Sequence, residues 1–271
     1  ATLTWDSVQG TLSEPLEIRG IHYREGETRL DVARLRADYA LWPLTSRRID
    51  VNTLELDGVV LQLPRDDAPF ELPRWPDILP TLDMPVTISV QDLRVRDLKV
   101  SRAGAPLLHA GSIRSRFTLG DGLLRLETFA MASDRGDVSL AGHYLPAKEF
   151  DTDLRGSWRY TTTPGAPPAS LALRAKGDFN AFTLSVDGNA PAPLRLRLVL
   201  KDGRLPNWTF DASSEQFLSE SLGLPADAPW AFDVHASGQG GRAQLRGRVV
   251  RDGLAVGIEP SRLRLDAGVI T

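Results

Sequence analysis

The chain has 271 residues, of which 42% are hydrophobic and 25% are charged, a balance typical of a folded protein with a sizeable core. Its formal net charge of -3 comes from 32 basic and 35 acidic residues scattered along the sequence, so no basic stripe predicts nucleic-acid binding. The absence of cysteine excludes disulfides and thiolate chemistry, and no apolar run reaches the roughly 18 residues of a transmembrane helix.

A repeated template of eight residues, apolar at places 1, 3, 6 and 8, occupies the first half of the chain. It occurs as LEIRGIHY at 16–23, LELDGVVL at 54–61, LRVRDLKV at 93–100 and LRLETFAM at 124–131. Period-two alternation predicts half-buried strands, so each unit is expected to form one bent strand. The step of three between places 3 and 6 predicts a bulge, which Gly20, Gly58 and Asp97 at place 5 suit better than Thr128 does. The third unit begins 39 residues after the second, and upstream of them Ile49 and Val51 match Ile88 and Val90 at the same offset of 39 residues.

Two stretches interrupt the strands. Residues 64–85 contain six prolines, which do not fit inside a sheet, and are predicted to form a crossing loop with one helical turn near Pro76–Leu82. TTTPGAPPAS at 161–170 is predicted to be the tip of a hairpin.

The second half of the chain continues the alternation. The pattern covers Leu171 and Leu173, Leu184 and Val186, residues 194–200, Phe232 and Val234, and Leu263 and Leu265, with turn pairs such as Asp202-Gly203 between them. A helix is predicted for SSEQFLSESLG at 213–223: Ser213 is in place to cap it, Phe217, Leu218 and Leu222 share one face, and Gly223 ends it. The sequence therefore predicts an all-β fold of antiparallel hairpins with one short amphipathic helix.

Residues that could carry out chemistry are few. Glu149, Asp151 and Asp153 place three carboxylates on one strand face, but they alternate with Phe150, Thr152 and Leu154 as on any solvated strand. The histidines His22, His109, His143 and His235 have no i, i+4 partner that would form a metal site. GQGGRA at 238–243 is followed by a strand-like LRGRVV and not by a phosphate-binding helix. We therefore expect no enzyme, no cofactor and no metal.

A resemblance to a known family rests on residues 8–64. This stretch runs from a Gly-Thr-Leu start through L-x-I-x-G-I and LRADYALWPL to I-D-V-x-x-L-x-L-D-G-V, and VTISVQDLRVRDLKV continues the pattern after the Pro-rich segment. In these patterns the chain resembles the AsmA-like family of Gram-negative envelope proteins, most closely the N-terminal periplasmic portion of its TamB branch. Beyond about residue 150 the similarity is general to half-buried strands.

The resemblance implies an elongated, open, mainly antiparallel sheet curled into a trough (a β-taco) over residues 1–271, in the periplasm. In that family the apolar floor of the trough is thought to carry phospholipid between the inner and outer membranes. It also implies two contacts made by regions outside this sequence: an inner-membrane anchor, and a C-terminal region that meets the outer-membrane barrel TamA.

We therefore expect a lipid-transfer conduit with no catalytic residue, whose groove carries one set of apolar side chains. The groove residues are Leu16, Ile18, Leu54, Leu56, Val59, Leu61, Leu93, Val95, Leu98, Val100, Leu124, Leu126, Phe129 and Met131. Two alternatives remain open: an assembly factor that templates outer-membrane β-strands, and a closed β-solenoid or carbohydrate-binding module with a filled interior.

Overall fold

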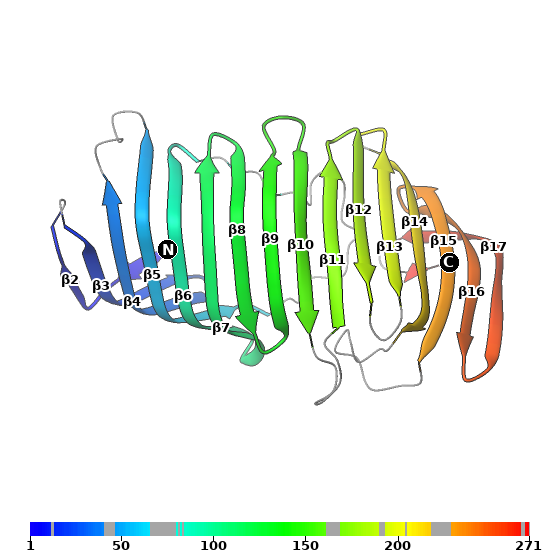
Figure 1. Ribbon diagram of the computed structural model, residues 1–271, viewed down its shortest axis with the longest axis horizontal. Helices are drawn as coiled ribbons and strands as arrows, with labels where there is room; N and C mark the ends of the chain where they lie inside the picture. The colour runs from blue at the N-terminus through cyan, green and yellow to red at the C-terminus, as the bar shows by residue number, and fades with distance from the viewer. Residues whose placement is uncertain are drawn as a thin grey trace. The chain divides into compact units, whose positions relative to one another are not determined.

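Every regular element that the computed structural model describes is a β-strand (Figure 1). The structure describes residues 1–11, 14–40, 47–65, 80, 82, 84–160, 169–189, 193–203, 205–217, 229–266 and 269–270. The chain forms two compact units, the first made of Ala1–Asp67 and Leu82–His143, and the second of Ala68–Thr81 and Tyr144–Thr271.

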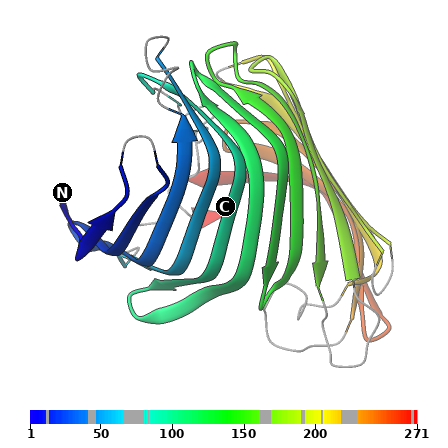
Figure 2. The same cartoon turned by 60° about the vertical axis from the view of Figure 1, so that its left-hand side comes forward.

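Unit 1 is a curved sheet of long strands. Its strands are β1 (Thr2–Thr4), β2 (Ser7–Gln9), β3 (Leu16–Glu25), β4 (Thr28–Ala40), β5 (Arg48–Leu63), β6 (Thr87–Arg102), β7 (Ala105–Gly120), β8 (Leu123–Ser133) and all but the last two residues of β9 (Gly136–Leu145). Both β1 and β2 pair with β3, and from β3 to β8 each strand pairs with the next. Figure 2 shows that the long strands of this unit bend along their length.

The pair β5–β6 is parallel, whereas the other pairs from β2 to β8 are antiparallel. Parallel neighbours require the chain to return from the end of one strand to the start of the next. The return between Leu63 and Thr87 is the stretch predicted as a crossing loop. Of the helical turn predicted near residues 76–82, only Pro80 and Leu82 are described, and neither is helical.

Unit 2 is an antiparallel meander from β10 to β18. Its strands are β10 (Asp151–Tyr160), β11 (Ala169–Gly177), β12 (Ala181–Gly188), β13 (Leu194–Lys201), β14 (Asn207–Phe217), β15 (Trp230–Gln239), β16 (Arg242–Arg251), β17 (Leu254–Asp266) and β18 (Val269–Ile270). Its core cluster is Tyr160, Ala169, Leu171 and Leu194. Tyr160 ends β10 and Ala169 begins β11, and residues 161–168 of the predicted hairpin tip lie outside the described residues.

The helix predicted at 213–223 is wrong over its described part. Residues 213–217 belong to β14, where Ser213 pairs with Arg195 of β13 and with Asp233 of β15. Two neighbouring strands satisfy this backbone, so tertiary pairing overrides the capping pattern and the helical spacing. Residues 218–223 lie outside the described residues.

The predicted fold class is otherwise confirmed, because each unit is an open, mainly antiparallel β-sheet. The predicted single trough over residues 1–271 stays a prediction.

Candidate functional site

One face of unit 1 is apolar from β3 to β8. The pairing register places apolar side chains directly opposite each other in rows that cross the strands. Three of these rows contain, in strand order, Leu16, Ala37, Leu54, Leu93, Ser115 and Phe129; Ile18, Leu35, Leu56, Val95, Ile113 and Met131; and Ile21, Val32, Val59, Leu98, Ala110 and Ser133. Ser115 and Ser133 are the polar members, and the row with Leu56 and Val95 is apolar on every strand. We call this surface the apolar face of unit 1. With about 4.8 Å between strands, a row from β3 to β8 is about 24 Å long.

The predicted groove residues all lie among the described residues, and none is exposed. Val59, Val95 and Leu126 are buried, with 6%, 8% and 9% of their surface accessible. The other eleven are half-buried: Leu16, Ile18, Leu54, Leu56, Leu61, Leu93, Leu98, Val100, Leu124, Phe129 and Met131. Most of the apolar face therefore keeps part of its surface accessible.

The middle of the face is held together by one cluster. Val32, Val59 and Val95 form its buried centre, and the half-buried side chains around them include Leu56, Leu93 and Leu98. Residues at places 1, 3 and 6 of the repeat thus pack together, which confirms that they share a face despite the step of three between places 3 and 6.

The bulge predicted at place 5 of the template, within the step of three, is not found in the first three units. Gly20, Gly58 and Asp97 adopt the left-handed backbone, with φ of 62°, 63° and 54°, but the register continues past them with no extra residue. No residue is inserted because β4 takes its own step of three at the same level, between Val32 and Leu35. The alternation of side chains therefore shifts by one residue at the same level in the paired strands, which keeps their apolar side chains on one face.

True register shifts occur elsewhere. One falls between Asp38 and Tyr39 in the β4–β5 pairing, and one between Val90 and Leu93 in the β6–β7 pairing. In the fourth repeat unit, Arg116 pairs with Thr128 and Phe117 pairs with Leu126, so β8 has an extra residue at Glu127. This unit is also displaced by two rows, because Phe129 lies level with Leu54 and Leu93 and not with Val59 and Leu98.

The sequence template missed the contributions of β4 and β7 to the apolar face. These strands supply Leu30, Val32, Leu35, Leu108, Ile113 and Phe117. These two strands run antiparallel to β3 and β6, but the spacing of places 1, 3, 6 and 8 is the same in either direction. Leu30, Val32, Leu35 and Ala37 of β4 therefore fit the template as written, and β7 fits it at Leu108, Ala110 and Ile113. The signal was present in the sequence.

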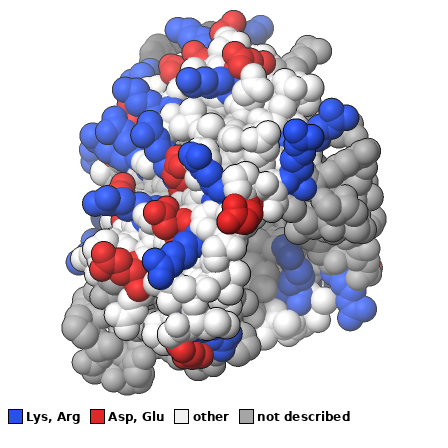
Figure 3. Space-filling view, turned by 90° about the vertical axis from the view of Figure 1, so that its right-hand side faces the viewer, with Lys and Arg blue, Asp and Glu red and all other residues white. Residues whose placement is uncertain are grey.

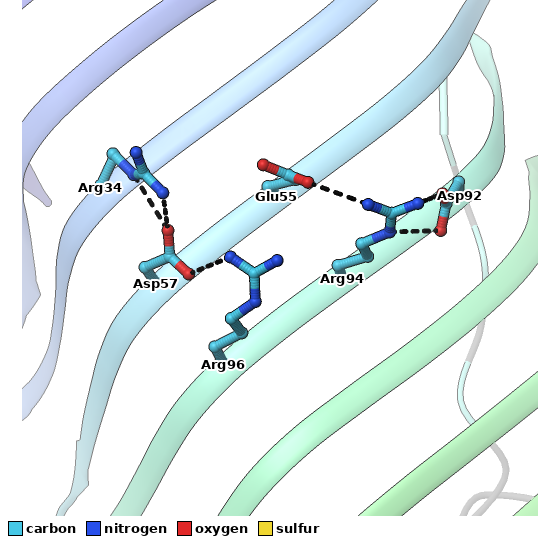
Figure 4. A network of polar contacts seen from close by, with 6 residues as sticks. All are labelled: Arg34, Glu55, Asp57, Asp92, Arg94 and Arg96. Atoms are coloured by element: carbon cyan, nitrogen blue, oxygen red, sulfur yellow. Dashed lines mark hydrogen bonds and ion pairs between the residues drawn. The ribbon is translucent and has the colours of Figure 1, made fainter.

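The opposite face of the same strands carries a network of charges (Figure 4). Asp57 accepts hydrogen bonds from Arg34 Nε at 2.9 Å and from Arg96 Nη1 at 3.3 Å. The hydrogen bond from Arg34 and the charges of Arg34 and Arg96 outweigh burial and lower the pKa of the Asp57 carboxyl below its ordinary value. The network connects β4, β5 and β6 without using any residue of the apolar face.

Histidines and carboxylates that the sequence offered as candidates for chemistry form pairwise contacts at the surface. His22, His109 and His235 each contact one aspartate, namely Asp31, Asp97 and Asp211, at 2.6, 2.8 and 2.6 Å. Asn180 Nδ2 donates to Glu149 at 3.2 Å, and Asp153 lies 4.0 Å from Lys176. Among the described residues, no group of three or more His, Asp or Glu side chains is arranged to hold a metal ion.

No described residue belongs to a helix long and apolar enough to cross a membrane. No protein-family model, curated protein or solved structure matches the chain.

Proposed function

We propose that the apolar face of unit 1 binds the acyl chains of phospholipid and lets them move along its rows. In this proposal the chain is a non-enzymatic lipid-transfer conduit of the AsmA-like type, in the periplasm between the inner and outer membranes. It belongs to an inner-membrane-anchored protein whose other regions include the one that meets TamA.

The observation that carries the proposal is the continuity of the rows. From β3 to β8 every strand places an apolar side chain in the row that contains Leu56 and Val95. Most of these side chains are half-buried, so their accessible surface is available to a ligand. This row has no polar step at which a moving acyl chain would lose its apolar surroundings.

The energetics favour such a surface. Exposing a 16-carbon chain to water costs roughly 0.8 kcal/mol per CH₂, or about 12 kcal/mol in total. An apolar row removes most of this cost at each position along it. Because the side chains are chemically alike, no single position binds the chain so tightly that it stops.

The test compares neighbouring residues on opposite faces. A photo-reactive amino acid is placed at Leu35, Leu98 or Met131 on the apolar face, and in matched variants at Arg36, Lys99 or Ala130, which are exposed. The proteins are irradiated in the presence of phospholipid vesicles, and the adducts are identified by mass spectrometry. We expect phospholipid adducts for the first set and none for the second.

Equal labelling of the two sets would contradict the proposal. Labelling of peptide and not of lipid at the apolar positions would favour the templating of β-strands, and no labelling at either set would indicate that this face is filled by the protein itself.

A further inference from the structure

A groove lies on the polar face of unit 2, the face that carries the polar residues of β12 to β17. Its volume is about 1020 Å³. Its floor includes one complete register row across six strands: Thr183, Val199, Thr209, Ser237, Gln244 and Arg262. A row across these strands is about 24 Å long, so the groove is long enough for an extended chain.

All of the charged residues that line the groove are basic. Arg197, Lys201, Arg242 and Arg262 are among its lining residues, which include no carboxylate. All four cations are exposed, and none of them forms an ion pair within the part of the chain that the structure describes. Two carboxylates lie near the groove and already accept hydrogen bonds: Asp211, across from Arg197, from His235 at 2.6 Å, and Asp202, next to Lys201, from Asn207 at 2.6 Å.

The remaining polar lining is neutral and suited to hydroxyl groups. Thr183, Thr209 and Ser237 contribute hydroxyls, and Gln239 and Gln244 contribute amides. Hydroxyls and amides donate and accept hydrogen bonds, whereas guanidinium groups bind sulfate, phosphate and carboxylate. The presence of both kinds of group in the lining fits a polymer that carries both hydroxyls and negative charges.

We propose that this groove binds an anionic polysaccharide. A lipid is disfavoured because its acyl chains have no continuous apolar row to follow in the groove, where Phe182, Val199 and Trp208 lie among polar lining residues. The apolar row that includes Leu184, Leu198 and Phe210 is on the other side of the sheet. Nucleic acid is a polyanion as well, and single-stranded DNA of equal charge therefore enters the test below as the competing ligand. Figure 3 shows that, on the side of the molecule it displays, Lys and Arg lie beside Asp and Glu with uncharged surface between them.

The test is calorimetric titration of the whole chain with a heparin-derived octasaccharide, which carries sulfate, carboxylate and hydroxyl groups. The groove variant is Arg197→Gln with Arg242→Gln. The control variant, Arg155→Gln with Arg174→Gln, removes two exposed cations from the same face, outside the groove lining, where the two residues lie directly opposite each other in β10 and β11.

We expect the groove variant to bind about tenfold more weakly and the control to bind within about twofold of the unmodified chain, since each exposed ion pair contributes modestly. Neutral dextran of the same length should not bind.

Absence of octasaccharide binding, or equal weakening by both variants, would overturn the proposal. So would equally tight binding of a single-stranded DNA of equal charge, because attraction would then be independent of the sugar. The outcome does not depend on the lipid proposal, which concerns unit 1.

Discussion

Arg94 lies directly opposite Glu55 in the parallel pair of β5 and β6, and its Nη1 donates a hydrogen bond to Glu55 Oε1 at 3.2 Å. The same guanidinium also contacts Asp92 of its own strand, with 3.2 Å between Nε and Oδ1. Two residues further along, Asp57 lies opposite Arg96 in the same manner. Charges of opposite sign thus hold the parallel pair together on the face away from the apolar rows.

Asp57 accepts hydrogen bonds from two arginines, so its replacement should weaken unit 1. We expect Asp57→Asn to lower the free energy of unfolding by about 1 kcal/mol, since the side chain is only partly buried and its ion pairs are partly screened. The measurement is urea denaturation followed by circular dichroism. Asp137→Asn, at an exposed position of β9, is the control and should change stability little. Equal effects of the two changes would show that the network contributes nothing.

The contribution of Asp57 should also depend on pH. The pKa of its carboxyl is lower in the folded protein than the ordinary value of 3.8, mainly because of the hydrogen bond from Arg34. Its stabilisation is therefore fully present above that ordinary value and is lost as the pH falls through the lower folded pKa. The stability difference between the unmodified chain and Asp57→Asn should be larger at about pH 7 than at about pH 2. A difference that stays constant between these conditions would contradict this assignment.

The pattern of the first half of the chain predicted part of the apolar face of unit 1, without the contributions of β4 and β7. Apolar spacing at places 1, 3 and 6 identified Leu56, Val59, Leu93, Val95 and Leu98 as neighbours, and they form one cluster. The 39-residue offset between the second and third units is the register of the parallel pair β5–β6, as in the pair Glu55 and Arg94. Repetition predicted the pairing because parallel strands align equivalent residues.

Predictions from local sequence were wrong where pairing with a neighbouring strand determines the backbone conformation. The cap and spacing of residues 213–217 are compatible with a helix, but pairing with β13 and β15 makes this segment a strand. The groove of unit 2 could not be predicted either, because Thr183, Thr209 and Gln244 come together only through the register of four successive pairs.

Gly58 should tolerate substitution poorly. Its φ is 63°, and a Cβ added there would lie 3.0 Å from the Ala33 Cβ. We expect Gly58→Ala to lower the free energy of unfolding by about 1–2 kcal/mol, because an L side chain in the left-handed region is strained. Gly58→Asp should cost less, since Asp97 adopts the same conformation at the equivalent place of β6. Thermal denaturation is the measurement, and Gly111→Ala is the control because its added Cβ meets no atom within 4 Å.

Two buried serines should respond in opposite directions to removal of the hydroxyl. Ser115 Oγ donates to the Thr128 carbonyl at 2.9 Å, whereas Ser214 Oγ has no hydrogen-bond partner among the described residues. We expect Ser115→Ala to destabilise the protein by about 1 kcal/mol and Ser214→Ala to stabilise it by about the same amount, because an unsatisfied buried hydroxyl is costly. Denaturant titration of both variants checks this. A loss of stability in Ser214→Ala would indicate that its hydroxyl has a bound partner.

A charge placed within the apolar rows should block lipid binding without affecting the other face. Leu61 is half-buried in the row that contains Leu30 and Val100, and the next residue, Gln62, is exposed on the opposite side. We expect Leu61→Glu to reduce bound phospholipid several-fold, because a carboxylate on the row must lose water when an acyl chain covers it. Gln62→Glu adds the same charge and should leave the lipid content unchanged, and Leu61→Met tests whether altered packing alone has an effect. Native mass spectrometry of the gently purified proteins gives the lipid content directly, and equal lipid content in Leu61→Glu and Gln62→Glu would contradict lipid binding on the apolar face.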